Sequence, residues 1–371
     1  MQLPKWLPFV VACTLAVSGA AALDALVFRT PWYVAHLEPN SSTGLFELVL
    51  QRERDAQKIN GNNMVITLGD SRMAYSPRLA NQITSQTGYV FRHAGVAGSD
   101  ARAWYYMMRD LDPTRRRYRA VVLPVDDYDD EDLDFNPNDD IRALHYVIAR
   151  LRLRDVAEFA RSFESPALQW EAFRGGVWKG IVFQADLLVF LAHPKPRLRQ
   201  VAFYRQNFDF WTYGYVESDR SLAGLAIDWK TMTATMPPNL DDDQVATIKT
   251  ALLRNAAPQT GRVAAFRRHW MGKIIDMYRG SPTKIVFLRL PRGPVVRPDN
   301  LVHKLSSSIR ELGARPNAML VPEHAFDSLE RPELFRDALH LNREGIARFS
   351  PMLAIETGHI LDEARTKQAV R

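Results

Sequence analysis

The feature that most constrains the fold is an alternation of strand and helix patterns between residues 63 and 127. Apolar runs of strand length occur at 63–68, 89–93 and 118–125, and helical patterns separate them at 76–88 and 101–111. Strands that alternate with helices in this way form parallel sheets with crossover helices. We therefore expect an α/β fold whose reactive groups gather at the carboxyl ends of the strands.

The alternation stops near residue 131, and residues 131–282 read as helical and irregular sequence. Helical periodicity predicts helices within 141–163, 242–256 and 264–280. Strand patterns return at 283–291 and 317–326, and a last helix is expected at 342–361. The simplest architecture is one α/β domain over residues 61–371, with a large helical insertion at about 131–282.

The N-terminal segment indicates the compartment. Residues 6–23 carry no charge and just reach the length that can span a bilayer. We expect residues 1–28 to form a signal anchor and residues 29–60 a membrane-proximal connection. A cleaved signal peptide ending near Ala20–Ala22 and a lipoprotein signal at Cys13 are the alternatives. Lys5 before the apolar stretch favours a single-pass inner-membrane protein with its catalytic domain in the periplasm.

Composition excludes several classes of protein. Lys+Arg exceed Asp+Glu by 48 to 42, which permits an anionic polysaccharide or lipid partner but gives no basic stripe for nucleic acid. The single cysteine excludes an intramolecular disulfide and a C-x-x-C site. No histidine pair has zinc-site spacing, and nucleotide-binding glycine motifs are absent, so we expect no metal and no cofactor.

Two unusual stretches lie in the insertion or at its start. Residues 126–140 are densely acidic; a solvated loop is the favoured interpretation, and a calcium site the alternative. Residues 203–216 are rich in aromatic side chains. These rings either pack in the insertion or against a membrane, or they form a platform for sugar rings beside the site.

A Gly-Asp-Ser sequence ends the first strand and places Ser71 just beyond it. A serine hydroxyl needs a base within hydrogen-bond reach, and the base needs a third group to orient it. Asp337 and His340 are three residues apart just before the last helix, a spacing that lets a carboxylate hold an imidazole. The non-catalytic alternatives are that Ser71 is a turn residue and that Asp337 caps a helix, with His340 at the surface.

These blocks resemble the GDSL/SGNH hydrolase superfamily, which has G-D-S near the start and D-x-x-H near the end. The resemblance implies a three-layer, flavodoxin-like parallel sheet and a catalytic triad of Ser71, His340 and Asp337. The extension His340-Leu341-Asn342 with Gly345, and the N-terminal anchor, resemble the membrane-anchored branch. That branch includes proteins of alginate O-acetylation and teichoic-acid D-alanylation, which work with membrane-bound O-acyltransferases.

The resemblance also implies an oxyanion hole. The backbone N–H groups of Ser71 and Gly98 are its expected donors, with Gly95 as a fallback for Gly98. The family's third block, G-x-N-D, has an asparagine donor at its third position, but this chain has Asp126 there. A carboxylate there would repel the oxyanion, and losing one such donor typically costs about 10²–10³ in rate. Arg72, next to Ser71, is expected to form a salt bridge or pack rather than bind substrate.

The resulting hypothesis is an exported, membrane-anchored serine esterase or O-acyltransferase. Its expected substrates are acyl esters of cell-surface or exported polysaccharides, with acetyl as the expected group. A second hypothesis keeps the fold without the activity, as a scaffold or binding partner of a membrane-bound O-acyltransferase, and Asp126 favours it. A lipid esterase or thioesterase is a third possibility, which would call for a more apolar insertion.

Overall fold

A computed structural model describes residues 6–58, 63–73, 76–130, 137–208, 218–254, 260–298 and 305–369. The chain forms two compact units. The helical unit comprises Met1–Gln51 with Asp140–Phe208, and the sheet unit comprises Arg52–Asp139 with Asp209–Arg371. The range expected to form one insertion is thus shared between the two units. Lys5, the central part of the acidic stretch (131–136) and the second half of the aromatic stretch (209–216) lie outside the described residues.

A five-stranded parallel sheet forms the centre of the sheet unit, which confirms the expected α/β class. The strand order is β2-β1-β3-β6-β7. Every residue of β1 and β3 is buried, as expected for strands whose two faces are both covered. The strands span Met64–Thr67 (β1), Val90–His93 (β2), Ala120–Val125 (β3), Lys284–Arg289 (β6) and Ala318–Leu320 (β7).

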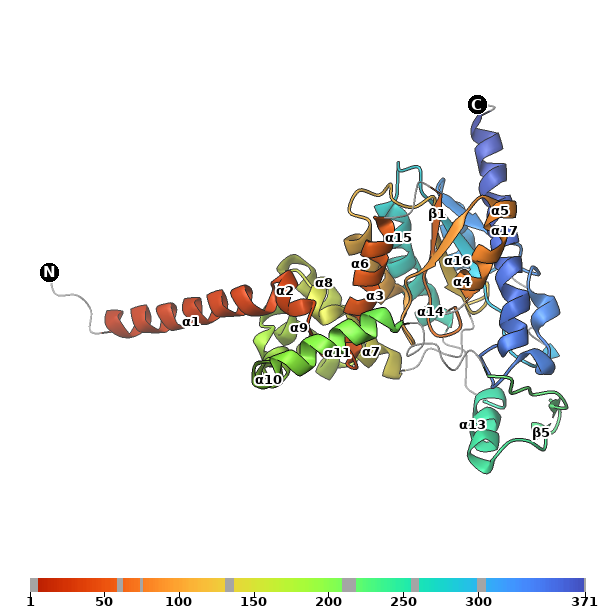
Figure 1. Ribbon diagram of the computed structural model, residues 1–371, viewed down its shortest axis with the longest axis horizontal. Coiled ribbons are helices and arrows are strands. Elements are labelled where there is room, and N and C mark those ends of the chain that lie inside the picture. The colour runs from red at the N-terminus through yellow and green to blue at the C-terminus, as the bar shows by residue number, and fades with distance from the viewer. Residues whose placement is uncertain are drawn as a thin grey trace. The chain divides into compact units, whose positions relative to one another are not determined.

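Helices cover both faces of this sheet (Figure 1). On one side α17 packs on α4 and α5, and on the other α6 packs on α15 and on the π-helical turn Arg267–Met271. The helices of this unit span Ser76–Ala80 (α4), Thr84–Thr87 (α5), Ala101–Leu111 (α6), Asp242–Leu252 (α13), Thr260–Phe266 (α14), Gly272–Met277 (α15), Ser307–Gly313 (α16) and Arg343–Ala369 (α17). Buried apolar side chains of these helices and of the strands make the core.

Several expected helices are shorter or differently wound. The helix expected at 76–88 consists of α4, a 3-10 turn and α5, and it ends at Gly88. The helix expected at 264–280 begins earlier, at Thr260, and contains the π-helical turn. A small antiparallel hairpin of β4 (Ala226–Asp228) and β5 (Thr233–Thr235) was not expected. Its strands have three residues each, too few to show a period of two.

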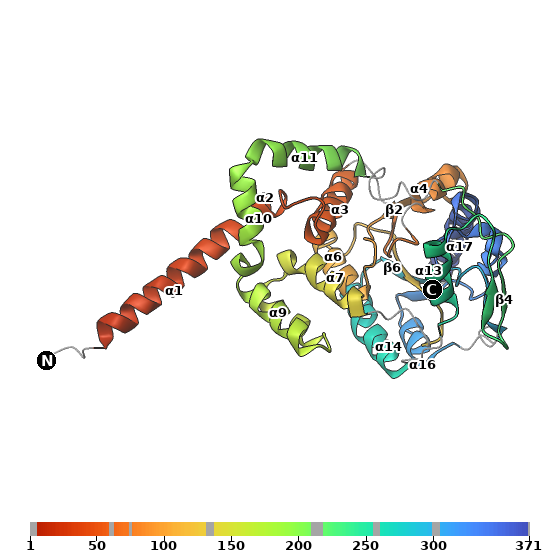
Figure 2. The same ribbon diagram turned by 90° about the horizontal axis from the view of Figure 1, so that it is seen from below.

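The helical unit contains the N-terminal apolar helix α1, Leu7–Phe28. Among the described residues, α1 is the helix that by itself is long and apolar enough to cross a membrane. The unit also holds α2 (Pro31–Val34), α8 (Val156–Arg161), α9 (Pro166–Val177), α10 (Gly180–Ala192) and α11 (Pro194–Gln206). Helices α3 (Ser42–Gln57) and α7 (Pro137–Val147) each cross the boundary between the units. Figure 2 shows α9, α10 and α11 following one another within this unit.

Candidate active site

Ser71 lies in the turn that follows β1. Leu68 continues the strand pairing, because its N–H donates to the carbonyl of Val122 at 3.0 Å. Gly69 then has a φ of +136°, a conformation that side chains with a Cβ rarely adopt. This glycine turns the chain out of the sheet at its carboxyl edge. Ser71 therefore stands where reactive groups of parallel sheets gather.

The structure brings the three residues of the expected triad together. The Oγ atom of Ser71 lies 2.8 Å from Nε2 of His340, although 269 positions separate the two residues. The other ring nitrogen, Nδ1, lies 3.0 Å from both carboxylate oxygens of Asp337. An ionised carboxylate only accepts hydrogen bonds, so Nδ1 carries the proton and Nε2 offers a lone pair to the Ser71 hydroxyl.

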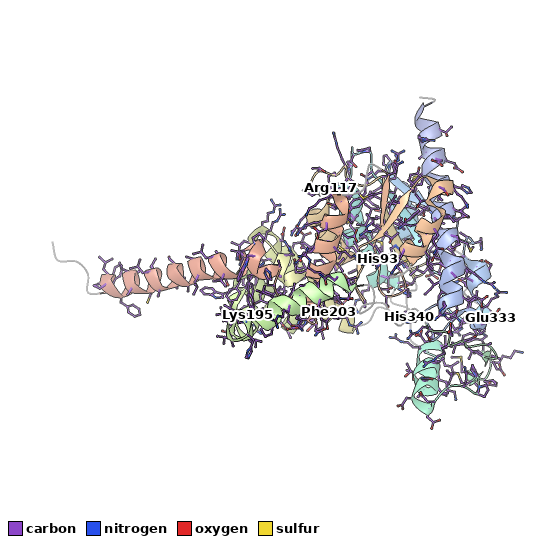
Figure 3. All side chains as sticks on the ribbon, viewed as in Figure 1. His93, Arg117, Lys195, Phe203, Glu333 and His340 are labelled. Carbon is purple, nitrogen blue, oxygen red and sulfur yellow. The ribbon has the colours of Figure 1, made fainter. Side chains whose placement is uncertain are left out.

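A tight loop before α17 holds Asp337 and His340 in place. A β-bridge joins Phe335 to Leu341, and the Arg336 N–H donates to the His340 carbonyl at 3.0 Å. The loop is therefore closed at its base by backbone contacts. Its closure explains how two residues only three apart can face each other through their side chains. Figure 3 marks His340 in this C-terminal part of the chain.

The local structure keeps Asp337 ionised. Its Oδ1 accepts hydrogen bonds from the backbone N–H groups of Leu339 at 2.9 Å and His340 at 2.8 Å. Burial works against the charged carboxylate, but the His340 ring and these two N–H groups outweigh it. Together they hold the pKa of Asp337 well below its usual range. Asp337 is thus a permanent negative partner for an imidazolium at His340.

Asn342 fixes the start of the helix that follows the triad loop. Its side-chain oxygen accepts the Gly345 N–H at 2.9 Å, which satisfies a free donor of the first turn of α17. Its amide nitrogen donates to the carbonyls of Glu333 at 2.7 Å and Arg220 at 3.1 Å. Asn342 is buried and so ties the triad loop to the chain at residue 220. Asn342 is part of the H-L-N-x-x-G sequence noted above, but its bond to Arg220 could not be expected from the sequence.

The glycine loop after β2 is attached to the turn that carries Ser71. The Ser99 hydroxyl donates to the Gly69 carbonyl at 3.0 Å and accepts the Trp104 indole N–H at 2.9 Å. A Cβ on Gly95 would lie 1.8 Å from the Gly69 carbonyl oxygen, so the two backbones touch. Gly98, the expected oxyanion donor, has a left-handed φ of +66° in the same loop. The loop that carries Gly98 is thus bound directly beside the Ser71 turn.

Arg72 pairs with the carboxylate that stands in place of the family asparagine. Its guanidinium makes a salt bridge to Asp126 at the end of β3. The same group binds Asp70, with Nη2–Oδ2 at 2.8 Å and Nε–Oδ2 at 3.1 Å. The side chains of Arg72, Asp70 and Asp126 are 18%, 20% and 25% exposed, so solvent screens these pairs only in part. Arg72 is therefore shared between the two carboxylates and offsets part of the negative charge of Asp126.

His93 lies at the end of β2, just before the glycine loop that carries Gly95 and Gly98 (Figure 3). Burial, together with the nearby positive charges of Arg52 and Arg92, lowers the pKa of His93 to about 3. The ring is therefore neutral at physiological pH. Its Nδ1 lies 3.4 Å from the Thr67 hydroxyl on the neighbouring strand. This histidine belongs to the packing under the site rather than to the triad.

A second group of charged side chains lies at the carboxyl ends of β3 and β6. Arg292 contacts Glu330 at 2.8 Å and Asp127 at 3.6 Å. The buried Arg289 also pairs with Glu330 and with Asp327. These pairs fix Asp127, the neighbour of Asp126, so the edge of the sheet beside the site is rigidly bonded. In the part of the chain that the structure describes, no three His, Cys, Asp or Glu side chains come together as a metal site.

Comparison with known proteins adds no relative. No protein-family model matches the chain, and no curated protein sequence matches it.

Proposed function

We propose that this chain is a membrane-anchored serine acyl-ester enzyme of the SGNH type, an esterase or O-acyltransferase. The observation that carries the proposal is the hydrogen-bonded series from Ser71 through His340 to Asp337, with distances of 2.8 and 3.0 Å. A nucleophile, a base and an orienting carboxylate within these distances are the requirements for acyl transfer through a serine. A turn serine or a capping aspartate has no need of all three contacts.

In the proposed reaction, Ser71 Oγ attacks the carbonyl carbon of an acyl ester while His340 Nε2 takes the hydroxyl proton. The tetrahedral intermediate collapses when the C–O bond to the alcohol breaks, and His340 returns the proton to the departing oxygen. Water or a sugar hydroxyl then attacks the acyl-serine while His340 takes its proton. The bond between the acyl carbon and Ser71 Oγ breaks, and His340 returns the proton to Oγ. Asp337 stays ionised throughout and stabilises the imidazolium. The backbone N–H groups of Ser71 and Gly98 are the proposed oxyanion donors.

The salt bridge from Arg72 to Asp126 supports catalysis over a scaffold role. An aspartate at the family's donor position is an obstacle when its charge is free, because it repels the developing oxyanion. Arg72 supplies the opposite charge from the residue next to the nucleophile. Asp126 is therefore a weaker argument for a catalytically inactive protein than the sequence alone indicates.

The topology of the sheet supports the flavodoxin-like, SGNH-type assignment. Counted along the chain, the five parallel strands lie in the order 2-1-3-4-5, which is the flavodoxin-like order. Ser71 follows the first of these strands, next to the point where the order reverses. Ligands of open α/β sheets bind at such a point.

The proposed substrates are acyl groups, acetyl first, on polysaccharides outside the cytoplasm. Helix α1 supports this placement because it is long and apolar enough to cross a membrane. Lys5 before it favours export of the rest of the chain to the periplasm. A membrane-bound O-acyltransferase is the proposed partner that would supply the acyl group.

The test uses the full chain in detergent micelles with a chromogenic acetyl ester, and intact-mass measurement of an acyl adduct. Wild-type protein and Ser162→Ala, a matched change in the helical unit, should release the chromophore or gain an acetyl mass. Ser71→Ala should do neither. Activity that survives in Ser71→Ala would contradict the proposal, and silence in all three folded proteins would favour the scaffold hypothesis.

A further inference from the structure

Helices α9 and α10 carry large apolar side chains at the surface of the helical unit. Such side chains normally occur singly on soluble proteins, and a larger group marks an interaction surface. The helices are 12 and 13 residues long and meet at a 62° bend. Their exposed apolar residues, named the apolar face below, include Trp170, Phe173, Val177, Leu188, Val189 and Leu191.

The opposite side of α10 packs and hydrogen-bonds within the helical unit. Phe183 and Phe190 are buried there. Asp186, the one carboxylate of α10, accepts the Tyr33 hydroxyl at 2.8 Å and a guanidinium N–H of Arg197 at 2.8 Å. The helix therefore has a polar and packed inner side and an outer side that is almost wholly apolar. Gln184 is the one polar side chain among the exposed residues of α10, so the surface that this helix presents is apolar and suited to contact with lipid.

The junction of α9 and α10 is bonded to the end of α1. Asp24 near the end of α1 accepts the Gly180 N–H at 2.7 Å. Arg29, just after α1, donates to the carbonyls of Gly176 at 3.0 Å and Val177 at 2.7 Å. Because α1 has 22 residues, it is ~33 Å long and matches the ~30 Å hydrocarbon core of a bilayer. Its final turn, and with it the α9–α10 junction, would lie at the membrane surface.

Neither α9 nor α10 can cross the bilayer by itself, although the two together have the length and apolar character of a broken span or a re-entrant loop. Helices of 12 and 13 residues extend only ~18–20 Å, well short of the ~30 Å core. Their bend is bonded to the end of α1, which places it at the membrane surface rather than at the bilayer centre, and this favours two helices that each lie at the surface. The helix that follows supplies positive charge, since Lys195, Arg199 and Arg205 of α11 are exposed. Figure 3 marks Lys195 and Phe203 on this helix. Exposed cations next to an apolar face fit anionic phospholipid head groups.

We propose that α9 and α10 lie in the plane of the membrane surface, with the apolar face among the acyl chains of anionic phospholipids. The cations of α11 then contact the head groups. The inference goes beyond acyl-ester chemistry and rests on the proposed membrane anchoring by α1. It assigns the surface to lipid rather than to a protein partner.

The test measures the depth of single labelled positions in full-length protein in vesicles of phosphatidylethanolamine and phosphatidylglycerol. Cys13 is the chain's only cysteine and lies in α1, so the wild-type protein labelled there reports on the anchor. In a Cys13→Ser background, a polarity-sensitive fluorophore is placed at Leu188→Cys and at Phe173→Cys. Asp243→Cys, an exposed position in the acidic first turn of α13, is the matched control.

Blue-shifted emission at positions 188 and 173, lost on adding lipids with a nitroxide near the head group, would support the proposal. The probe at 243 should show neither effect. Water-like emission at 188 and 173 while Cys13 reports a bilayer would overturn the surface proposal and leave the anchor intact. Water-like emission at all of these positions would overturn both. Lipid-like emission at 188 and 173 alone would support the apolar face and refute the anchor.

Discussion

Replacing Arg72 by Gln should impair acyl transfer because it frees the charge of Asp126. Asp70, Arg72 and Asp126 together carry a formal net charge of −1, and Arg72→Gln makes it −2. Because Arg72 is next to Ser71 in the chain, we take its charge to act on the oxyanion from roughly 5–10 Å. Removing that charge then costs ~2–3 kcal/mol of oxyanion stabilisation at an effective dielectric constant of ~20. That energy corresponds to a loss of about 10²-fold in kcat/KM.

A second substitution in the same protein should restore much of the loss. Arg72→Gln with Asp126→Asn returns the net charge to −1 and places the family's amide at the donor position. Asp126→Asn alone should equal or exceed the wild type in kcat/KM. The effect of charge is thereby separated from the loss of the Arg72 side chain itself.

The assay is steady-state hydrolysis of a chromogenic acetyl ester by the four proteins, with thermal unfolding measured in parallel. Arg348→Gln is the matched control, since this arginine pairs with Glu344 on the exposed side of α17. The reasoning would be refuted if Arg72→Gln stayed within twofold of the wild type. It would equally be refuted if the double variant were no better than Arg72→Gln alone.

Three further predictions follow from the site. Asp337→Asn should lower kcat by about 10³–10⁴-fold, because an amide cannot hold the proton on Nδ1 of His340 in the same way; burst kinetics on the acetyl ester would show it, and a loss below tenfold would contradict the role. His93, whose pKa is about 3 when folded against the usual 6.5, should make the protein less stable as pH falls from about 6 towards 3. The unfolded chain binds the proton in that range, which costs up to ~1.4 kcal/mol per pH unit, and chemical denaturation of His93→Asn should show a flatter pH profile. Gly95→Ala should destabilise the sheet unit by ~1–3 kcal/mol, because its Cβ meets the Gly69 carbonyl; an unchanged melting temperature would contradict that contact.

The central strands could be predicted because buried parallel strands leave continuous apolar runs in the sequence. β1, β2 and β3 lie within the expected runs, and β6 and β7 lie within 283–291 and 317–326. The order of the strands could not be predicted from these runs. Which strand lies beside β3 depends on tertiary packing, and its second neighbour is β6, far along the chain.

The expected helix at 141–163 shows why helix boundaries were harder. Its periodicity is continuous, yet the chain forms α7, two 3-10 turns and α8. Arg150 in the first of these turns pairs with the buried Glu47 of α3. A contact with so distant a residue leaves no trace in the local pattern. The grouping of residues 140–208 with the N-terminal segment is likewise a property of packing alone.

The two motifs predicted the residues that meet at the site, namely Ser71 in G-D-S and Asp337 and His340 in D-x-x-H. Both motifs lie in loops at the same edge of the sheet. The sequence does not predict the pairing of Arg72 with Asp126. Their contact needs the relative register of two adjacent strands, which the sequence does not provide. The part played by Ser99 was also missed, since a serine after a glycine turn looks like any loop residue.

The distance along the chain between Ser71 and His340 has a consequence for biogenesis. These residues are 269 positions apart, and closing a chain segment of that length costs ~5 kcal/mol of loop entropy. Until the final segment has emerged from the ribosome and docked on the sheet, the serine hydroxyl has no base. Under the proposed function, an incomplete chain would therefore have no acyl-ester activity, because its nucleophile lacks a base until the C-terminal segment is in place.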